Sequence, residues 1–270
     1  MKQASIVVVY NRALTDCEAV TGLLQANTDV LVYDNSERDC SNADFCSRHG
    51  WTYLGGTGNA GLSKAYQACI DRLEQIQFDG LVTVFDDDTT VDAAFFDAIH
   101  HAAEMQPEVS LFFPVLRAGE RIVSPQIIHQ NQHAEFFADV DACFSYQGAD
   151  MFAFNSGMTI RSEVFRKVRY NTELFLDGID YDFLRRCYQQ GIRAAAVPFE
   201  MEHGFSGAQH PDAAQALKRF SNYAKDHAVV LKDNPAGYRY LVGKRALHLM
   251  LMYHKLSFFH IFKQNQPKKM

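Results

Sequence analysis

The sequence lacks the features that mark several classes of protein. No apolar run reaches the roughly 18 residues of a membrane-spanning helix, and the start MKQASIVVVYNR has too short an apolar part, and no cleavage pattern, for a signal peptide. The six cysteines form no CxxC pair, which excludes a zinc ribbon and a small disulfide framework. We therefore expect a cytoplasmic protein whose cysteines are reduced thiols used mainly in packing.

The sequence also has no excess of positive charge. Its formal net charge is -6 at pH 7, whereas a nucleic-acid-binding protein needs a basic surface to neutralise phosphates. We therefore expect no nucleic-acid partner. The chain contains no internal repeat and no low-complexity linker. Its 270 residues, 47% of them hydrophobic, can bury a large core, as one larger domain or as one domain with an appendage.

The first hundred residues alternate between β-branched runs and segments with helical spacing of apolar residues. Strands are predicted at 5–10, 29–33, 51–54 and 81–85, and helices at 15–25, at about 62–73 and from residue 92. This alternation is typical of an α/β fold with a mostly parallel central sheet covered by helices on both faces. In such sheets ligands bind beyond the carboxyl ends of the strands.

The second half of the chain is less regular. It contains predicted strands at 110–114, 151–155, 158–161 and 194–199 and a predicted helix at 180–190. The pattern becomes helical after Pro211, and the composition shifts near residues 208–211. We therefore predict one α/β domain over residues 1–210 and a C-terminal helical appendage over residues 211–270.

An acidic triplet, Asp86-Asp87-Asp88, directly follows the apolar strand LVTVF. Three adjacent carboxylates repel one another and raise each other's pKa unless a cation lies among them. Their hard oxygen ligands favour Mg²⁺ or Mn²⁺, which keeps coordination positions open for the phosphates of a substrate. A helix N-terminus decorated with acidic residues is the alternative interpretation.

Seven short segments occur in a characteristic order: SIVVVYNR, VYDNS, GNAGLSKAYQACI, VFDDDT, NSGMTIRSEVF, FLDGIDYDFLRR and EHGFSG. In this order they resemble the inverting glycosyltransferases of family 2, which have the GT-A fold, and especially their bacterial rhamnosyltransferase-like members. The resemblance covers about the first 210 residues. It implies a GT-A catalytic domain whose donor substrate is a nucleoside diphosphate sugar.

The resemblance also implies which residues bind the nucleotide. It places Asp34 against the nucleobase, and Asn59 and Gly61 in a loop against the nucleotide. Asp86 then faces the ribose or the metal, with Asp87 beside it in the donor site. From the residues alone, Asp34 is equally well the first residue of an Asx-turn, and the glycine-rich stretch is equally well an ordinary turn before a helix.

The metal ligands that the resemblance implies are Asp86, Asp88 and His203. Asp88 binds the cation that bridges the diphosphate. His203, in EHGFSG, completes the coordination just before a glycine-bearing loop. A lone histidine is more often a satisfied structural residue, and this chain has eleven histidines.

Sugar transfer with inversion needs a base that takes the proton of the acceptor hydroxyl. Asp180, in FLDGIDYDF, matches the acidic position of the family and is the predicted catalytic residue. Asp177 and Asp182 are the alternatives, because any carboxylate at a helix N-terminus is stabilising. Arg185 and Arg186, on the same helix, are expected to form surface ion pairs.

Residues 218–263 alternate basic side chains with aromatic and aliphatic ones. This composition suits the surface of an anionic bilayer, where a lipid-linked acceptor would lie, and it would place the protein at the inner face of the plasma membrane. The other interpretation is a helix pair that buries its apolar stripe against the catalytic domain or against a second subunit, as in a homodimer.

Together these features predict a metal-dependent glycosyltransferase of the hexosyltransferase class. It would transfer one sugar, with rhamnose suggested by the subgroup, to a glycan or lipid-linked oligosaccharide in bacterial surface polysaccharide synthesis, such as that of capsule or lipopolysaccharide. A nucleotidyltransferase is one rival, but it would carry a glycine-rich basic loop after its first strand, where this chain has YNRALTD. The other rival is an inactive glycan-binding module of the same fold.

Overall fold

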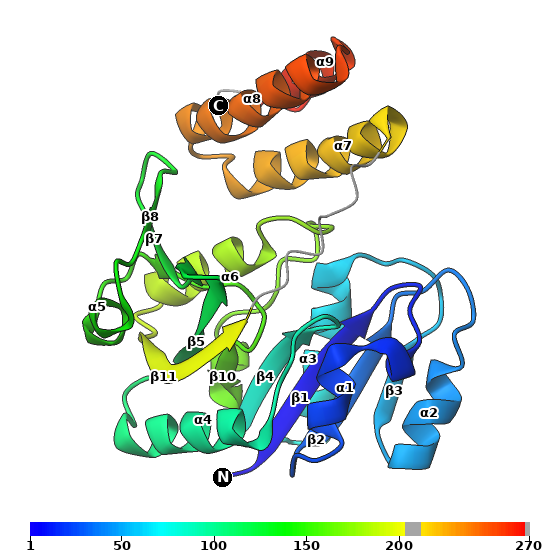
Figure 1. The fold of residues 1–270 in the computed structure, drawn as a ribbon, viewed down its shortest axis with the longest axis vertical. Helices are drawn as coiled ribbons and strands as arrows, with labels where there is room; N and C mark the ends of the chain where they lie inside the picture. Colours follow the sequence, from blue (N-terminus) through cyan, green and yellow to red (C-terminus); the bar gives the residue numbers. More distant parts are fainter. Residues whose placement is uncertain (203–211, 268–270) are drawn as a thin grey trace.

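The computed structural model describes residues 1–202 and 212–267 of the chain. Within these residues, eight strands form one large sheet in the order β11-β5-β10-β4-β1-β2-β3, with β6 paired to β5 (Figure 1). The strands are β1 (Gln3–Val9), β2 (Asp29–Asp34), β3 (Thr52–Gly55), β4 (Leu81–Asp86), β5 (Leu111–Ala118), β6 (Arg121–Ser124), β10 (Thr159–Arg161) and β11 (Ala194–Glu202).

Most strands of the large sheet run parallel. β1 pairs in parallel with β2 and β4, β2 with β3, and β5 with β11, whereas β10 is antiparallel to its neighbours β4 and β5. Parallel strands require a crossover connection, usually a helix. The crossovers after β1 to β4 carry α1 (Glu18–Leu23), α2 (Asn42–His49), α3 (Leu62–Gln75) and α4 (Ala93–Met105). The predicted α/β fold with a mostly parallel central sheet is therefore confirmed.

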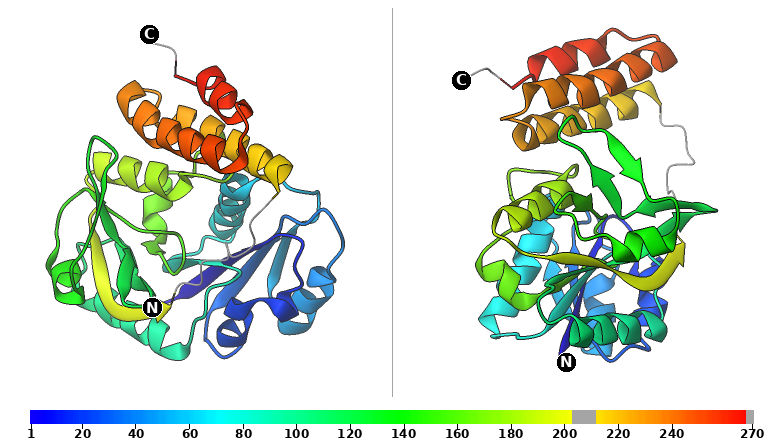
Figure 2. Two further views of the ribbon diagram at one scale, coloured as in Figure 1. Left: turned by 45° about the horizontal axis from the view of Figure 1, so that its top comes forward. Right: turned by 90° about the vertical axis from the view of Figure 1, so that its left-hand side faces the viewer.

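The two faces of the sheet bury separate cores. Side chains alternate along each strand, so that Val7 packs with α1, α2 and α4, while Ile6 packs with α3 and with α6 (Ile179–Gln189). The two views of Figure 2 show helices on both sides of the sheet. The predicted covering of both faces is thus present.

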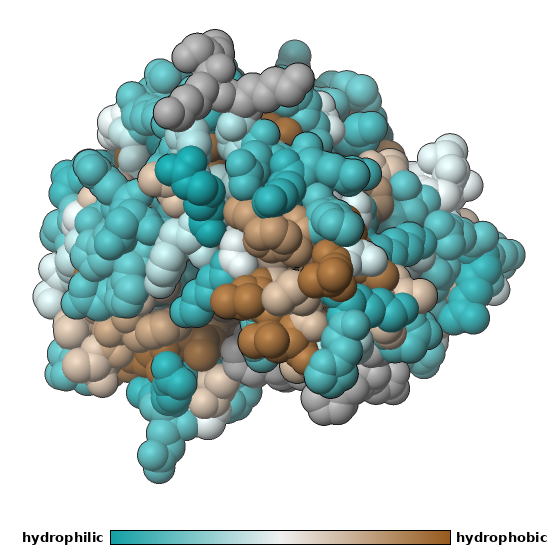
Figure 3. Space-filling model, turned by 90° about the horizontal axis from the view of Figure 1, so that it is seen from above, coloured by the Kyte–Doolittle hydropathy of each residue, from teal (hydrophilic) through white to brown (hydrophobic). Residues whose placement is uncertain are grey.

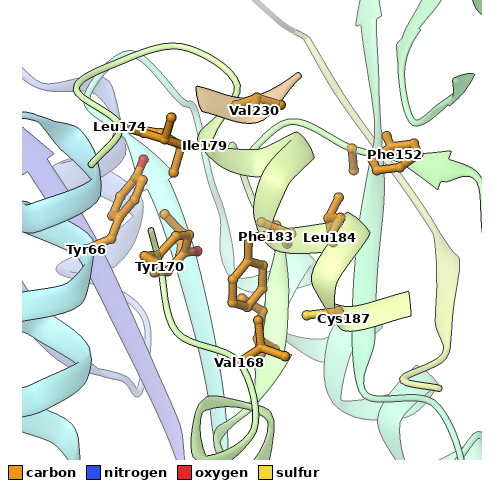
Figure 4. Packing of buried hydrophobic residues seen from close by; sticks show 14 of the residues in the cluster. Tyr66, Phe152, Val168, Tyr170, Leu174, Ile179, Phe183, Leu184, Cys187 and Val230 are labelled. Atoms are coloured by element: carbon orange, nitrogen blue, oxygen red, sulfur yellow. The ribbon is translucent and has the colours of Figure 1, made fainter. Parts of the chain in front are cut away.

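Aromatic rings join α3 to α6 on the second face. Figure 4 shows Tyr66 of α3 and Phe183 of α6 with Tyr170 between them. The ring centroid of Tyr170 lies 5.1 Å from that of Tyr66 and 4.6 Å from that of Phe183. Contacts of this kind contribute about 0.5–1.5 kcal/mol each beyond the burial of their area. They fix the N-terminal parts of α3 and α6 relative to each other, at the edge of the sheet where a ligand is expected.

Several short elements were not predicted. They are α2 and β6, the strands β7 (Gln126–Ile128) and β8 (Ala134–Phe136) of a second, three-stranded sheet that also contains β9 (Met151–Phe152), the helix α5 (Val140–Ser145), and two 3₁₀ turns at Leu14–Asp16 and Ser162–Arg166. Strands of two or three residues are too short to display the alternation that identifies a strand. The strand predicted at 151–155 is only β9, and it belongs to this second sheet.

The last three helices, α7 (Ala213–Val230), α8 (Pro235–Tyr253) and α9 (Ser257–Gln264), form a layer above the rest of the molecule (Figures 1 and 2). Phe220, Tyr238 and Phe258 are buried in the same hydrophobic cluster as α3 and α6. These helices therefore pack on the α/β domain, as the second interpretation of this segment expects. Of the helices in residues 1–202 and 212–267, none combines the length and apolarity needed to span a bilayer.

Candidate active site

Two aspartates lie at the carboxyl ends of the strands on either side of β1. Asp34 ends β2 and is in register with Val9, and Asp86 ends β4 and is in register with Val8. Ligands bind at the carboxyl edge of such a sheet, in the crevice between the loops that follow neighbouring strands. The sheet topology therefore brings together two predicted site residues that are far apart in sequence.

Asp34 is buried, and its carboxylate is already hydrogen-bonded. Its Oδ1 accepts from the backbone N–H of Ser36 at 2.9 Å, and its Oδ2 accepts from Asn42 Nδ2 at 2.9 Å and from Tyr53 Oη at 3.2 Å. The first of these bonds forms an Asx-turn, which is the alternative interpretation of Asp34. The other two hold the carboxylate in one orientation, and its contact with a nucleobase stays a prediction.

The glycine-rich loop between β3 and α3 lies directly on the end of β2. Gly55 has a φ of +101°, and a Cβ there would lie 2.3 Å from the carbonyl oxygen of Asp34. Asn35 Oδ1 accepts a hydrogen bond from the backbone N–H of Ala60 at 2.8 Å. Only glycine permits this backbone conformation together with so close an approach. The loop is thereby anchored next to the predicted nucleotide site.

Asn59 and Gly61 occupy the far end of the same loop. Asn59 Oδ1 accepts from the backbone N–H of Gly61 at 3.1 Å. Gly61 has a φ of +91°, and a Cβ there would lie 2.8 Å from the ring of Phe175. The backbone N–H of Leu62 donates to the Phe175 carbonyl at 2.7 Å. The loop thus joins the segment that carries the predicted base, and the nucleotide-binding role of both residues stays a prediction.

Asp86 contacts two hydroxyl groups from other parts of the chain. Ser156 Oγ donates to one oxygen of its carboxylate, and Tyr66 Oη lies 3.5 Å from the other. Burial, followed by the charges of Asp86 and Asp180, raises the pKa of Tyr66. Ser156 and Tyr66 are site residues that sequence reasoning missed, although both stand in segments, NSGMTIRSEVF and GNAGLSKAYQACI, that carry the family resemblance.

Asp87 turns toward Arg12 instead. The Arg12 guanidinium Nη1 lies 3.6 Å from Asp87 Oδ2. Burial raises the pKa of Asp87, Arg12 opposes this, and the carboxylates of Asp88 and Asp86 raise it further. The predicted repulsion within the acidic triplet is therefore present at Asp87, with burial as the larger cause.

Asp88 presents a carboxylate that makes no hydrogen bond or ion pair with the described part of the chain. Beside the triplet, Thr89 Oγ1 and Asn155 Oδ1 are buried without a hydrogen-bond partner among the same residues. No group of three or more His, Cys, Asp or Glu side chains in residues 1–202 and 212–267 is placed to hold a metal ion. His203, the third predicted ligand, lies outside the described residues.

This set of residues fits a cation whose coordination is completed by substrate. Mg²⁺ is commonly bound by one or two carboxylates together with substrate phosphates and water, without a full cage of protein ligands. Asp86 and Asp88 can supply such oxygen ligands at the end of β4. Their role as metal ligands stays a prediction.

The three candidate bases differ in their partners. Asp182 is buried and forms ion pairs with Arg185 at 3.0 Å and with Arg186 at 2.8 Å. Both arginines therefore neutralise a buried carboxylate of their own helix. Asp177 forms a bidentate ion pair with Arg219 of α7, with 2.7 Å between Oδ1 and Nη2. Among the described residues, Asp180 alone of the three has no arginine or lysine partner.

The environment of Asp180 differs from that of the two paired aspartates, and its role as the base stays a prediction. Burial raises its pKa to about 6, a backbone hydrogen bond from Tyr181 opposes this, and the charge of Asp86 raises it further. A carboxyl group with a pKa close to the working pH can accept and release a proton readily.

A buried carboxylate of α7 holds the segment that precedes Asp180. Asp226 accepts hydrogen bonds from three successive backbone N–H groups, those of Phe175 at 2.9 Å and of Leu176 and Asp177 at 2.8 Å. Charge-assisted hydrogen bonds of this type contribute about 1.5–3 kcal/mol each. α7 thereby positions the loop that carries the predicted base.

A hollow of about 300 Å³ opens beside Asp180, between α6, the small sheet and the helices α7 and α8. A larger hollow of about 430 Å³ lies at the C-terminal end of α3, next to Leu73 and Phe165. The predicted donor site lies at the N-terminal end of α3, whereas this larger hollow lies at the C-terminal end. The larger hollow is therefore not part of the donor site. The smaller hollow is the one that belongs to the candidate site.

No protein-family model matches the sequence, and no curated protein matches it. Solved structures do match. The crystal structure of GalNAc-T7 with UDP, GalNAc and Mn²⁺ matches 100% of this chain with a TM-score of 0.63 and 10% sequence identity. This chain spans 55% of that chain.

Two further structures are similar over almost the whole chain. The mannosyltransferase PcManGT from Pyrobaculum calidifontis, in complex with GDP-Man and Mn²⁺, matches 98% of this chain and 73% of its own, with a TM-score of 0.58 and 14% identity. S. aureus TarS 1-349 in complex with UDP-GlcNAc matches 99% of this chain over 82% of its own length, with a TM-score of 0.54 and 12% identity. The chain therefore has the GT-A glycosyltransferase fold, and this part of the family resemblance is confirmed.

Proposed function

We propose that this chain is a metal-dependent inverting glycosyltransferase, of the hexosyltransferase class, that moves a sugar from a nucleoside diphosphate donor to an acceptor hydroxyl. The observation that carries the proposal is the position of Asp180, a half-buried carboxyl group that lines the hollow and has no arginine or lysine partner among the described residues. The fold it shares with enzymes bound to UDP, GDP-Man or UDP-GlcNAc supports the same function.

In this proposal the carboxyl edge of the sheet binds the donor. Asp34 and the loop of Asn59 and Gly61 hold the nucleotide, and Asp87 stays paired with Arg12 beside it. Asp86 and Asp88 hold Mg²⁺ or Mn²⁺, with His203 as a further ligand. When bound, the cation would neutralise charge on the departing diphosphate.

Asp180 acts on the acceptor. Its carboxylate takes the proton of the acceptor hydroxyl as that oxygen bonds to the anomeric carbon, while the bond from this carbon to the diphosphate breaks on the opposite side. The configuration at the anomeric carbon is therefore inverted.

A screen of nucleotide sugars for thermal stabilisation, with and without Mn²⁺, tests this function. A bound donor at 100 times its Kd adds about 2.7 kcal/mol of stability, and we expect stabilisation by one donor that depends on the metal. Stabilisation by a nucleoside triphosphate with a sugar phosphate would instead indicate a nucleotidyltransferase. Stabilisation by glycans alone, without hydrolysis of any donor, would indicate an inactive binding module.

The finer assignments rest on the resemblance of the segments. The rhamnosyltransferase-like pattern favours rhamnose as the transferred sugar and a bacterial surface polysaccharide, built on a glycan or lipid-linked acceptor, as the product. Nucleoside diphosphate rhamnose is therefore the first donor to compare with glucose and mannose donors in the screen.

A lipid-linked acceptor would require contact with a membrane, and α8 and α9 offer a surface for it. Six large apolar side chains, the apolar patch, are 38–68% exposed there: Tyr240, Leu247, Leu251, Met252, Leu256 and Phe259. Lys244 Nζ lies 5.8 Å from the ring centroid of Tyr240, and Lys263 Nζ lies 4.8 Å from that of Phe259. Figure 3 shows hydrophobic residues gathered on this side, with hydrophilic ones around them. We propose that the apolar patch rests on an anionic bilayer at the inner face of the plasma membrane.

Substitution of the apolar patch tests this contact better than truncation, because Tyr238, Val242 and Phe262 of α8 and α9 are buried. The double variant Leu247→Glu and Leu251→Glu should keep the fold and lose sedimentation with phosphatidylserine-containing liposomes. Binding of the unaltered protein should weaken with salt, since each Lys or Arg near such a surface contributes about 1 kcal/mol. Equal liposome binding by both proteins would contradict the proposal, and a change from dimer to monomer would identify the apolar patch as a subunit interface.

A further inference from the structure

The hollow beside Asp180 is walled partly by the C-terminal helices. Tyr181 comes from α6 and Phe152 from the small sheet, while Tyr223 and His227 come from α7 and Leu241 from α8. Its volume of about 300 Å³ is at the lower end of the range of small-molecule sites. Since Asp180 lines the same hollow, a molecule bound there would reach the predicted base directly.

The wall that faces Asp180 is aromatic. The rings of Phe152 and Tyr181 lie parallel within 27°, with their centroids 4.6 Å apart, and Gln132 Nε2 donates to Tyr181 Oη at 3.1 Å. Aromatic side chains with a polar end combine apolar contact area with hydrogen bonding. A sugar ring has the same two properties, with an apolar C–H face and hydroxyl groups at its edge.

His227 adds a hydrogen-bond acceptor of defined orientation. The side chain is 9% exposed, and its Nδ1 lies 2.9 Å from the carbonyl oxygen of Tyr223. Only a donor can pair with a carbonyl, so Nδ1 carries the proton and Nε2 of the neutral ring has a lone pair. Burial lowers the pKa of His227, which keeps the ring neutral at neutral pH.

Gly178 lies beside His227 Nε2 in the lining of the hollow. A Cβ at Gly178 would lie 3.9 Å from His227 Nε2 and 3.3 Å from Val230 Cγ2. Within the described residues no hydrogen bond to Nε2 is found, and Nε2 is not one of the fully buried unpartnered polar atoms, so it is accessible on an otherwise buried side chain that lines the hollow. Such an acceptor can pair with a hydrogen-bond donor of a bound ligand.

We propose that this hollow is the acceptor subsite, in which Phe152 and Tyr181 contact the face of a sugar ring and His227 Nε2 accepts a hydrogen bond from one of its hydroxyl groups. This inference rests on the proposed glycosyltransferase function. It makes α7 and α8 determinants of acceptor specificity, in addition to their packing role. Asp226, one residue before His227, holds the loop before Asp180, so the same helix positions both the acceptor and the base.

Binding of p-nitrophenyl glycosides, measured by saturation-transfer NMR, tests the subsite in the full chain. We expect at least one glycoside to bind the unaltered protein. His227→Phe, which keeps the volume but removes Nε2, should weaken binding about tenfold, the contribution of one hydrogen bond of roughly 1–1.5 kcal/mol. His227→Gln should restore part of the affinity because it returns an acceptor atom. His248→Phe, at an exposed position of α8, is the matched control.

Leu241→Trp provides a second test that does not alter the histidine. The larger side chain enters the hollow from α8, and we expect glycoside binding to be lost while donor binding and donor hydrolysis persist. Binding that is absent from the unaltered protein, or equal in all variants, would overturn the subsite. Failure of every nucleotide sugar to bind or to be hydrolysed would instead overturn the proposed function, so the two failures are distinguishable.

Discussion

Asp180→Asn is expected to lower sugar transfer by roughly 10²- to 10⁴-fold, the usual contribution of a positioned general base. Asparagine keeps the size of the side chain but cannot take the proton of the acceptor hydroxyl. Donor affinity should barely change, since Asp180 lies at the hollow on the acceptor side. Single-turnover transfer and donor titration, measured separately, give the two quantities.

The pKa of Asp180 adds two pH-dependent results. The carboxylate is the active form, so the transfer rate of the unaltered enzyme should rise with pH, reach half its maximum near pH 6 and level off above it. A cation at Asp86 would offset the contribution of that carboxylate and move the inflection downward. The rate of Asp180→Asn should show no such inflection.

Stability should change in the opposite sense. The folded-state pKa of Asp180 is raised above its unfolded value, so this group stabilises the fold at low pH, and the stabilisation is lost as the pH rises through about 6. At pH 7.5 the buried charge therefore costs stability, and Asp180→Asn should melt at or above the temperature of the unaltered protein. At pH 4 the two melting temperatures should agree.

Asp182→Asn is the matched control for Asp180. It removes a buried carboxylate that pairs with Arg185 and Arg186, and we expect a loss of roughly 1–3 kcal/mol of stability. The transfer rate should fall little. If Asp182→Asn abolished transfer and Asp180→Asn stayed active, the base would be Asp182. If neither changed the rate, the inverting mechanism would be wrong for this chain.

The sequence was sufficient for the strands of the large sheet other than β6, because most of them are long enough to show their pattern. The runs around Val7, Val32 and Val84 are apolar and β-branched, and segments with helical spacing follow the first, third and fourth strands. The three-residue strands β7 and β8 contain no such pattern, and neither they nor the short elements β6, α2 and α5 were predicted. The strand pattern also predicted that the triplet beginning at Asp86 lies at the carboxyl end of a strand, where ligands of such sheets bind, and the sheet has Asp34 at the same edge.

The rest of the site depends on contacts between residues distant in sequence. Asp226 bonds to the segment about fifty residues before it, and Ser156 bonds to Asp86 seventy residues before it. No local pattern encodes such pairs. The same limit applies among the three acidic candidates, since only the fold shows that Asp177 and Asp182 are paired with arginines.

Asp88→Ala is expected to reduce metal-dependent transfer by at least about 10²-fold, since a metal ion contributes several kcal/mol to stabilising charge in the transition state. The fold should be unaffected, because the Asp88 carboxylate makes no hydrogen bond or ion pair within the described residues. Its removal also relieves repulsion on Asp87, whose pKa is raised partly by Asp88. Chelation should abolish transfer in the unaltered enzyme, and Mg²⁺ or Mn²⁺ should restore it where the larger Ca²⁺ does not.

Binding of Mn²⁺ gives a measurement that does not depend on turnover. In the presence of UDP or GDP, the electron paramagnetic resonance signal of free Mn²⁺ should fall with the unaltered protein and much less with Asp88→Ala. Asp79→Ala is the matched control, because Asp79 is an exposed aspartate at the opposite end of β4. Unchanged Mn²⁺ binding together with retained transfer in Asp88→Ala would remove Asp88 from the metal site. Lost transfer with unchanged Mn²⁺ binding would place the carboxylate against the donor and leave the cation to other ligands.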